Sequence, residues 1–66
     1  MKGYRVVIDY TNWKGVRRER SVFPLGMEFA ATQWHPEPQW LVLALDLEDG
    51  EEKRFAMKDI HSWRPA

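Results

Sequence analysis

The chain has 66 residues, no cysteine, and ten basic against ten acidic side chains, so its formal net charge is zero. A chain of this length has room for one modest core, and without cysteine it cannot be supported by disulfides or thiolate metal sites. We therefore expect one domain over residues 1–66, in a reducing cytoplasm. The zero net charge excludes attraction of nucleic acid by a whole-molecule field, so any such binding must be local.

The apolar content is divided among short segments and four tryptophans. No run of about 18 apolar residues occurs and no secretion signal opens the chain, so we expect neither a membrane span nor export. A fully buried tryptophan contributes on the order of 2–3 kcal/mol, which a core this small requires. We therefore expect at least two tryptophans in the core, with Trp40 buried and Trp63 as a cap.

Two strands are predicted at the start of the chain. Residues 4–11 alternate between apolar and polar side chains, which is the period of a strand with one buried face. The polar residues 12–15 end in glycine and predict a hairpin turn. Residues 16–23 then form the second strand, which carries Arg18 and Arg20 on the same face.

The middle of the chain is less regular. Pro24 ends regular strand pairing because it lacks an amide donor. Residues 25–29 can resume as a bent or bulged strand, with Gly26 permitting the bend. Periodicity fails over residues 30–39, where two prolines predict a stiff, extended loop that carries aromatic side chains.

A second hairpin is predicted in the last third. Residues 41–47 form a nearly continuous apolar run, typical of a strand buried on both faces, and Asp49-Gly50 predicts a two-residue turn into a return strand over residues 54–57. Residues 58–63 predict a single helical turn over the barrel mouth, and residues 64–66 are expected to fray. We therefore predict an all-β, mainly antiparallel fold: a small, partly closed barrel of four to five strands with a short C-terminal helical turn.

Several short motifs stand in a definite order along the chain: Gly15, Arg18-Glu19-Arg20, Pro24-Leu25-Gly26, Trp34-His35-Pro36, Trp40-Leu41-Val42, Asp49-Gly50, Arg54-Phe55 and Asp59-Ile60. In this order they resemble the WYL domain over nearly the whole chain, and above all the short bacterial and phage-associated WYL-like proteins of unassigned function. The resemblance implies an Sm-like β-barrel that acts in transcription regulation by sensing a nucleotide or nucleic-acid ligand. Leu41 replaces the family's central tyrosine and Asp59 its usual arginine, so contacts of that arginine do not carry over, whereas Arg54 matches a family arginine.

Five residues are candidates for a ligand-binding site. Arg18 and Arg20 share a strand face, Arg54 can join them from the returning strand, and guanidinium groups bind phosphate bidentately. Trp34 and His35, in the proline-stiffened loop, offer faces on which bases stack, and Trp13 in the first turn can add another. Two alternatives stay open: nearby carboxylates, Glu19, Glu28 and Asp46, neutralise the arginines in surface pairs, and Trp34 folds back as a lid over the core.

The chain carries no catalytic signature. The two histidines, His35 and His61, do not stand at metal-binding spacings from carboxylates, and neither Ser21 nor Ser62 has the context of a nucleophile, so we expect no metal, no cofactor and no enzyme activity. We predict a non-catalytic module that binds a nucleotide or single-stranded nucleic acid in a regulatory role. The alternative is a protein-interaction module or a homo-oligomerising small barrel, with an apolar patch of Trp13, Trp34 and Met27 or an open strand edge as the contact.

Overall fold

Five antiparallel strands form one sheet in the order β4-β3-β2-β1-β5 in the computed structural model, which describes residues 3–34 and 36–66. This confirms the predicted all-β class. The strands are β1 (Val6–Thr11), β2 (Arg17–Ala30), β3 (Gln39–Asp46), β4 (Glu52–Ala56) and β5 (Ile60–Pro65), and a 3-10 turn, η1 (Met57–Asp59), joins β4 to β5.

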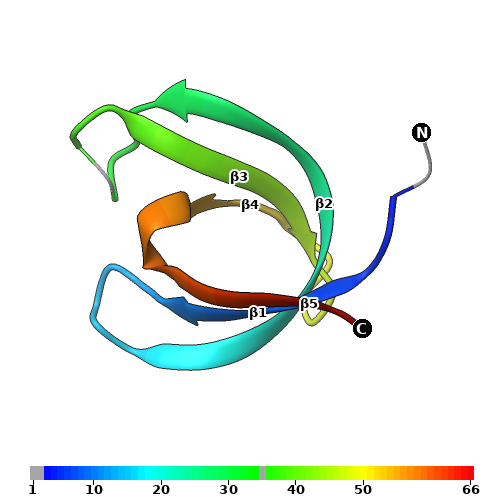
Figure 1. Cartoon of the computed structure of the whole chain (residues 1–66). Coiled ribbons are helices and arrows are strands. Elements are labelled where there is room, and N and C mark those ends of the chain that lie inside the picture. The colour runs from blue at the N-terminus through cyan, green and yellow to red at the C-terminus, as the bar shows by residue number, and fades with distance from the viewer. Residues whose placement is uncertain (1–2, 35) are drawn as a thin grey trace.

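The long strand β2 gives the sheet its curl. Its first part, residues 17–22, pairs with β1, whereas residues 22–30 pair with β3. β2 therefore passes from the half of the sheet that holds β1 and β5 to the half that holds β3 and β4 (Figure 1). The sheet curls over itself without closing, since β4 and β5 stand at its two ends, and the predicted partly closed fold is confirmed.

Pro24 does not end strand pairing, contrary to the prediction. The Leu47 amide donates to the Ser21 carbonyl at 2.9 Å, which fixes the hydrogen-bonding pattern between β2 and β3. In this antiparallel pattern the backbone nitrogen of Pro24 points away from β3, so β3 needs no donor from it. On that side β1 has already stopped pairing, at Val22, and no hydrogen bond is lost. The predicted bulge is present, because the register shifts between Pro24 and Gly26.

The first hairpin turn is as predicted, and the second is not. Gly15, with φ 82°, closes the first hairpin as predicted. In the second hairpin the Asp46 amide donates to the Glu51 carbonyl at 2.8 Å, so four residues rather than two form the loop. Only Gly50, with φ 72°, adopts a left-handed conformation there, so the predicted two-residue turn at Asp49-Gly50 is wrong.

The core lies between the two halves of the curled sheet. It consists of Val6, Ile8, Tyr10, Val22, Val42, Ala44 and Phe55, with Ile60 packed against it. Within the predicted buried run, Leu41, Val42 and Ala44 are buried, but Leu47 lies beyond β3 and is exposed. The run therefore forms a strand as predicted, with its last residue in the following loop.

None of the four tryptophans is buried, so the prediction of at least two in the core is wrong. Their exposed fractions lie between 45% and 54%. Strand alternation places Trp40 on the same face of β3 as the core residues Val42 and Ala44, but Trp40 lies near the start of the strand and outside the core cluster, where its ring packs edge-on against Phe29 at 5.5 Å. Aliphatic side chains, together with Tyr10 and Phe55, fill the interior instead.

The C-terminal segment also differs from the prediction. The 3-10 turn covers Met57–Asp59 and overlaps the predicted helical turn over residues 58–63 only at residues 58 and 59, because Ile60–Pro65 forms strand β5. β5 pairs with β1, and the Ala66 amide donates to the Arg5 carbonyl at 3.0 Å, so the predicted fraying of residues 64–66 is wrong as well. The free edge of β1 offers this segment an antiparallel ladder, interrupted by one register shift between Asp9 and Tyr10, and this pairing outweighs the weak local preference for a turn.

One side chain links distant strands of the open sheet. The buried Tyr10 hydroxyl of β1 accepts a hydrogen bond from the Ala56 amide of β4 at 3.1 Å, and its ring meets Phe55 edge-on at 4.9 Å. Burial raises the pKa of Tyr10, so the phenol stays protonated. Tyr10 therefore ties β1 to β4 beside the pocket described next.

Candidate binding pocket

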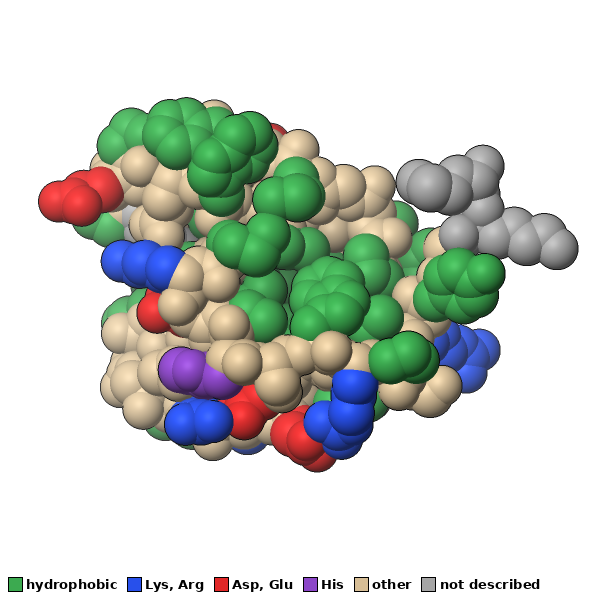
Figure 2. Space-filling view, viewed as in Figure 1, with side chains coloured by type: hydrophobic (Ala, Val, Ile, Leu, Met, Phe, Trp, Pro, Cys, Tyr) green, Lys and Arg blue, Asp and Glu red, His purple; other side chains and the backbone are tan. Residues whose placement is uncertain are grey.

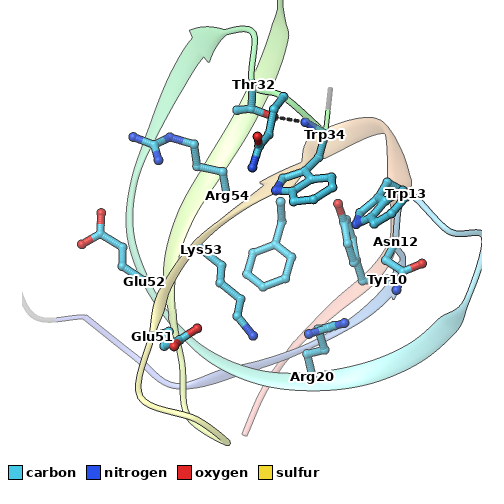
Figure 3. Close-up of a pocket in the computed structure, with 12 residues that line it drawn as sticks. Tyr10, Asn12, Trp13, Arg20, Thr32, Trp34, Glu51, Glu52, Lys53 and Arg54 are labelled. Carbon is cyan, nitrogen blue, oxygen red and sulfur yellow. Dashed lines mark hydrogen bonds between the residues drawn. The ribbon is translucent and has the colours of Figure 1, made fainter. Parts of the chain in front are cut away.

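A pocket of about 580 Å³ opens between the β1–β2 turn, the segment that follows β2, and β4 (Figure 3). This volume is in the range of small-molecule sites. The pocket is lined by Tyr10, Asn12 and Trp13 from β1 and its turn, Arg20 from β2, Thr32, Gln33 and Trp34 after β2, and Glu51, Glu52, Lys53, Arg54 and Phe55 from β4 and the preceding turn.

Two stacked indoles form one wall of this pocket. The ring centroids of Trp13 and Trp34 lie 4.7 Å apart at an interplanar angle of 20°. The Trp34 amide donates to the Thr32 hydroxyl at 3.2 Å, which helps to orient the segment. Each indole is about half exposed, so Trp34 does not fold back as a lid over the core. Because the two rings are already in contact, a further aromatic ring can stack only on an outer face of the pair.

A buried carboxylate, Asp46, pairs with two of the cationic side chains that line the pocket. Asp46 is 1% exposed, and its Oδ2 accepts hydrogen bonds from Arg20 Nη1 at 3.3 Å and Lys53 Nζ at 3.0 Å. Burial alone raises the pKa of Asp46, but the bond from the Glu48 amide and the Lys53 ammonium outweigh it, so the pKa lies below its ordinary value. The Arg20 guanidinium also lies over the Phe55 ring at 5.9 Å.

The structure brings three of the five predicted site residues to this pocket. Arg20, Trp34 and Arg54 line it, but the Arg54 guanidinium turns away from the stacked tryptophans (Figure 3). Arg18 shares a face of β2 with Arg20 yet pairs with Glu48 at 3.1 Å and does not line the pocket. His35 lies outside the described residues.

Carboxylates neutralise the arginines, as one of the two alternatives predicted. Arg20 pairs with Asp46, and Arg54 pairs with Glu28. Glu19 also pairs with an arginine, the C-terminal Arg64 at 2.7 Å. Lys53 is likewise held between Asp46 and Asp49. Each of these cationic side chains at the pocket therefore already has a carboxylate partner, with which an incoming anion must compete.

Sequence reasoning missed the residues that shape the pocket. Tyr10 looks like any inward-facing strand residue, and Lys53 is one of several charges around a turn. The one available signal was Asp46, a lone carboxylate inside the apolar run of residues 41–47, because a charge at such a position needs partners. Its partners, Arg20 and Lys53, come from different strands and are adjacent only in the folded chain.

Within residues 3–34 and 36–66, no group of three or more histidine and acidic side chains could hold a metal ion. No helix in the same part of the chain has both the length and the apolar content needed to cross a bilayer. Comparison with protein-family models, curated proteins and solved structures found no match to this chain. The structure alone therefore defines the class: a small, partly closed all-β domain with an aromatic pocket.

Proposed function

We propose that this chain is a non-catalytic, cytoplasmic binding module whose pocket takes a nucleotide or a short single-stranded nucleic acid. The observation that carries the proposal is the half-exposed Trp13–Trp34 pair at a nucleotide-sized pocket that also presents Arg20 and Lys53. A base that stacks on an aromatic side chain gains about 1–3 kcal/mol, whatever its identity. The resemblance to WYL domains, with the regulatory role in transcription that it implies, supports the same ligand class.

Stacking, rather than charge, supplies most of the binding in this proposal. Arg20, Lys53 and Arg54 already pair with carboxylates, and Glu51 and Glu52 also line the pocket. A phosphate must therefore compete with an existing partner. We expect the logarithm of the binding constant to fall with the logarithm of the salt concentration with a slope of about −0.7, the value for one phosphate contact on a single strand.

The four tryptophans provide the test, since each indole N–H gives its own NMR signal. Titration with mononucleotides and short single-stranded oligonucleotides is expected to shift the signals of Trp13 and Trp34, whereas Trp40 and Trp63 do not line the pocket and serve as internal controls. Absence of any shift at high micromolar ligand, or equal shifts of all four signals, would contradict the proposal.

Matched variants separate the pocket from the rest of the surface. Trp34→Ala is expected to weaken binding about tenfold or more, because it removes the stacking face. Trp40→Ala is the control, since Trp40 is exposed to almost the same extent, 54% against 52%. Arg54→Ala has its own control in Arg64→Ala, because Arg64 is another half-exposed arginine that pairs with a glutamate. Equal effects within either pair would argue against a site in this pocket.

A further inference from the structure

A second hollow, separate from the pocket, lies on the open side of the sheet. It has a volume of about 740 Å³ and shares no lining residue with the pocket. Residues 24–27 of β2 form one wall and residues 60–63 of β5 the other, with Val6 and Val42 of the core between them. Figure 2 shows hydrophobic side chains gathered across this face. We call this hollow the apolar groove.

The described lining of the apolar groove carries no strongly charged side chain. Among residues 3–34 and 36–66, no lysine, arginine, aspartate or glutamate lines it, although these residue types make up 30% of the chain. Leu25, Met27 and Trp63 are each about half exposed along it. Burying a charge against such a surface without a partner costs free energy, whereas burying apolar side chains gains it. Charge complementarity therefore calls for an apolar, uncharged occupant.

Both walls of the groove are strand edges without a neighbouring strand. β5 pairs only with β1, and β2 beyond Val22 pairs only with β3, within the residues that the structure describes. Each wall contributes four consecutive residues to the lining, so the groove follows the strand direction. An occupant that is itself extended fits this shape and can meet the unpaired main-chain groups.

The position of Trp63 shows which main-chain groups are free. The Ala66 amide bonds to Arg5, and antiparallel alternation then makes the Trp63–Ile8 pair a non-hydrogen-bonded one. The N–H and C=O of Trp63 consequently point away from β1, toward the free edge of β5. Pro65 occupies the next outward position and has no N–H, so the edge available for pairing is short.

We propose that the apolar groove binds a short, extended and uncharged apolar segment of another protein, which adds as a strand along β5 and packs alternate side chains against Leu25, Met27 and Trp63. A second copy of this chain fits less well. The other end strand of its sheet, β4, carries Glu52, Lys53 and Arg54 and would bring charges into a groove whose described lining offers them no charged partner.

The test uses the full chain and a defined set of octapeptides with valine, leucine, isoleucine or phenylalanine at every second position and serine or threonine between. Fluorescence anisotropy is expected to show binding by members of this set. The same peptides with N-methylated amides at alternate positions are expected to bind roughly tenfold more weakly or worse, because they keep the side chains and lose the main-chain donors. Hydrogen exchange of the Trp63 amide is expected to slow in the complex.

Met27→Glu is expected to weaken peptide binding by about tenfold or more, because it places a charge in the groove. Phe29→Glu is the matched control, since Phe29 lies on the same strand, is exposed to a similar extent and does not line the groove. Trp34→Ala, which damages the pocket, is expected to leave peptide binding unchanged. Because the two variants Met27→Glu and Trp34→Ala affect different ligands, failure of one proposal does not imply failure of the other.

Three results would overturn the inference. The first is no binding by any unmethylated peptide at millimolar concentration, and the second is equal binding by the N-methylated series. The third is a dimer in sedimentation velocity that Met27→Glu dissociates and Phe29→Glu does not, because the occupant would then be a second copy. Thermal unfolding of each variant confirms that the fold is intact.

Discussion

The Tyr10 hydroxyl accepts a hydrogen bond from the buried Ala56 amide at 3.1 Å, across 46 residues of sequence. β1 and β4 are not neighbours in the sheet, so this bond links two strands that share no backbone ladder. It also satisfies an amide on the outer edge of β4 that would otherwise be buried without a partner. One side chain thus substitutes locally for the backbone pairing that a closed barrel would supply.

Tyr10→Phe is expected to lower the free energy of unfolding by about 2 kcal/mol, because it leaves the Ala56 amide buried and unsatisfied. Urea denaturation measures this change. Tyr4→Phe is the control, since Tyr4 is 74% exposed and its substitution is expected to change nothing. If the two variants are equally stable, the Tyr10–Ala56 bond does not contribute.

Asp46→Asn is expected to destabilise the fold by about 3 kcal/mol, because it removes the negative charge that Arg20 and Lys53 share and leaves the nearly buried Arg20 guanidinium without its carboxylate partner. Asp49→Asn is the matched control. Asp49 also pairs with Lys53 but is exposed, so its substitution is expected to cost much less than that of Asp46. Chemical denaturation of both variants at neutral pH gives the comparison, and equal losses would contradict the structural role of Asp46.

Stability is expected to fall in acid. The pKa of Asp46 is lowered in the folded protein, as is the pKa of Asp49 beside Lys53, so the unfolded chain takes up protons first as the pH decreases. The stabilisation is complete above the unfolded pKa of about 4 and is lost as the pH falls through the folded values. Urea midpoints between pH 7 and pH 2 measure it. Asp46→Asn is expected to show a smaller acid loss than the parent chain; an identical loss would assign the effect to other carboxylates.

Gly50→Ala is expected to cost about 1–2 kcal/mol, because φ at this position is 72° and an L side chain is strained there. Gly26→Ala provides the contrast. Gly26 has no positive φ, and a Cβ added to it would meet nothing within 4 Å, so the variant is expected to be as stable as the parent or slightly more stable. Thermal midpoints of the two variants decide the point, and a loss of similar size in both would show that turn conformation is not the cause.

The local sequence pattern predicts much of the fold but little of the pocket. Alternation in residues 4–11 and the apolar run over residues 41–47 predicted β1 and β3, because side-chain period depends only on the strand itself. The prediction at Pro24 was wrong because a missing amide donor weakens pairing only where a neighbouring strand lies on the side to which that amide would point. Trp40 was misplaced because it shares a strand face with the core residues Val42 and Ala44 but lies near the start of β3, outside the core cluster, and hydrophobicity alone does not reveal how far along a strand the core extends.

Composition and periodicity by themselves determined a small all-β chain with two hairpins and an aromatic loop. These properties belong to single residues and their immediate neighbours. Only the tertiary structure decided that Trp13 stacks on Trp34, that Arg20 and Lys53 share Asp46, and that Arg18 stays outside the pocket. Each of these contacts joins segments whose distance is set by the curl of β2 and the register of its partners, and such distances are properties of the whole sheet.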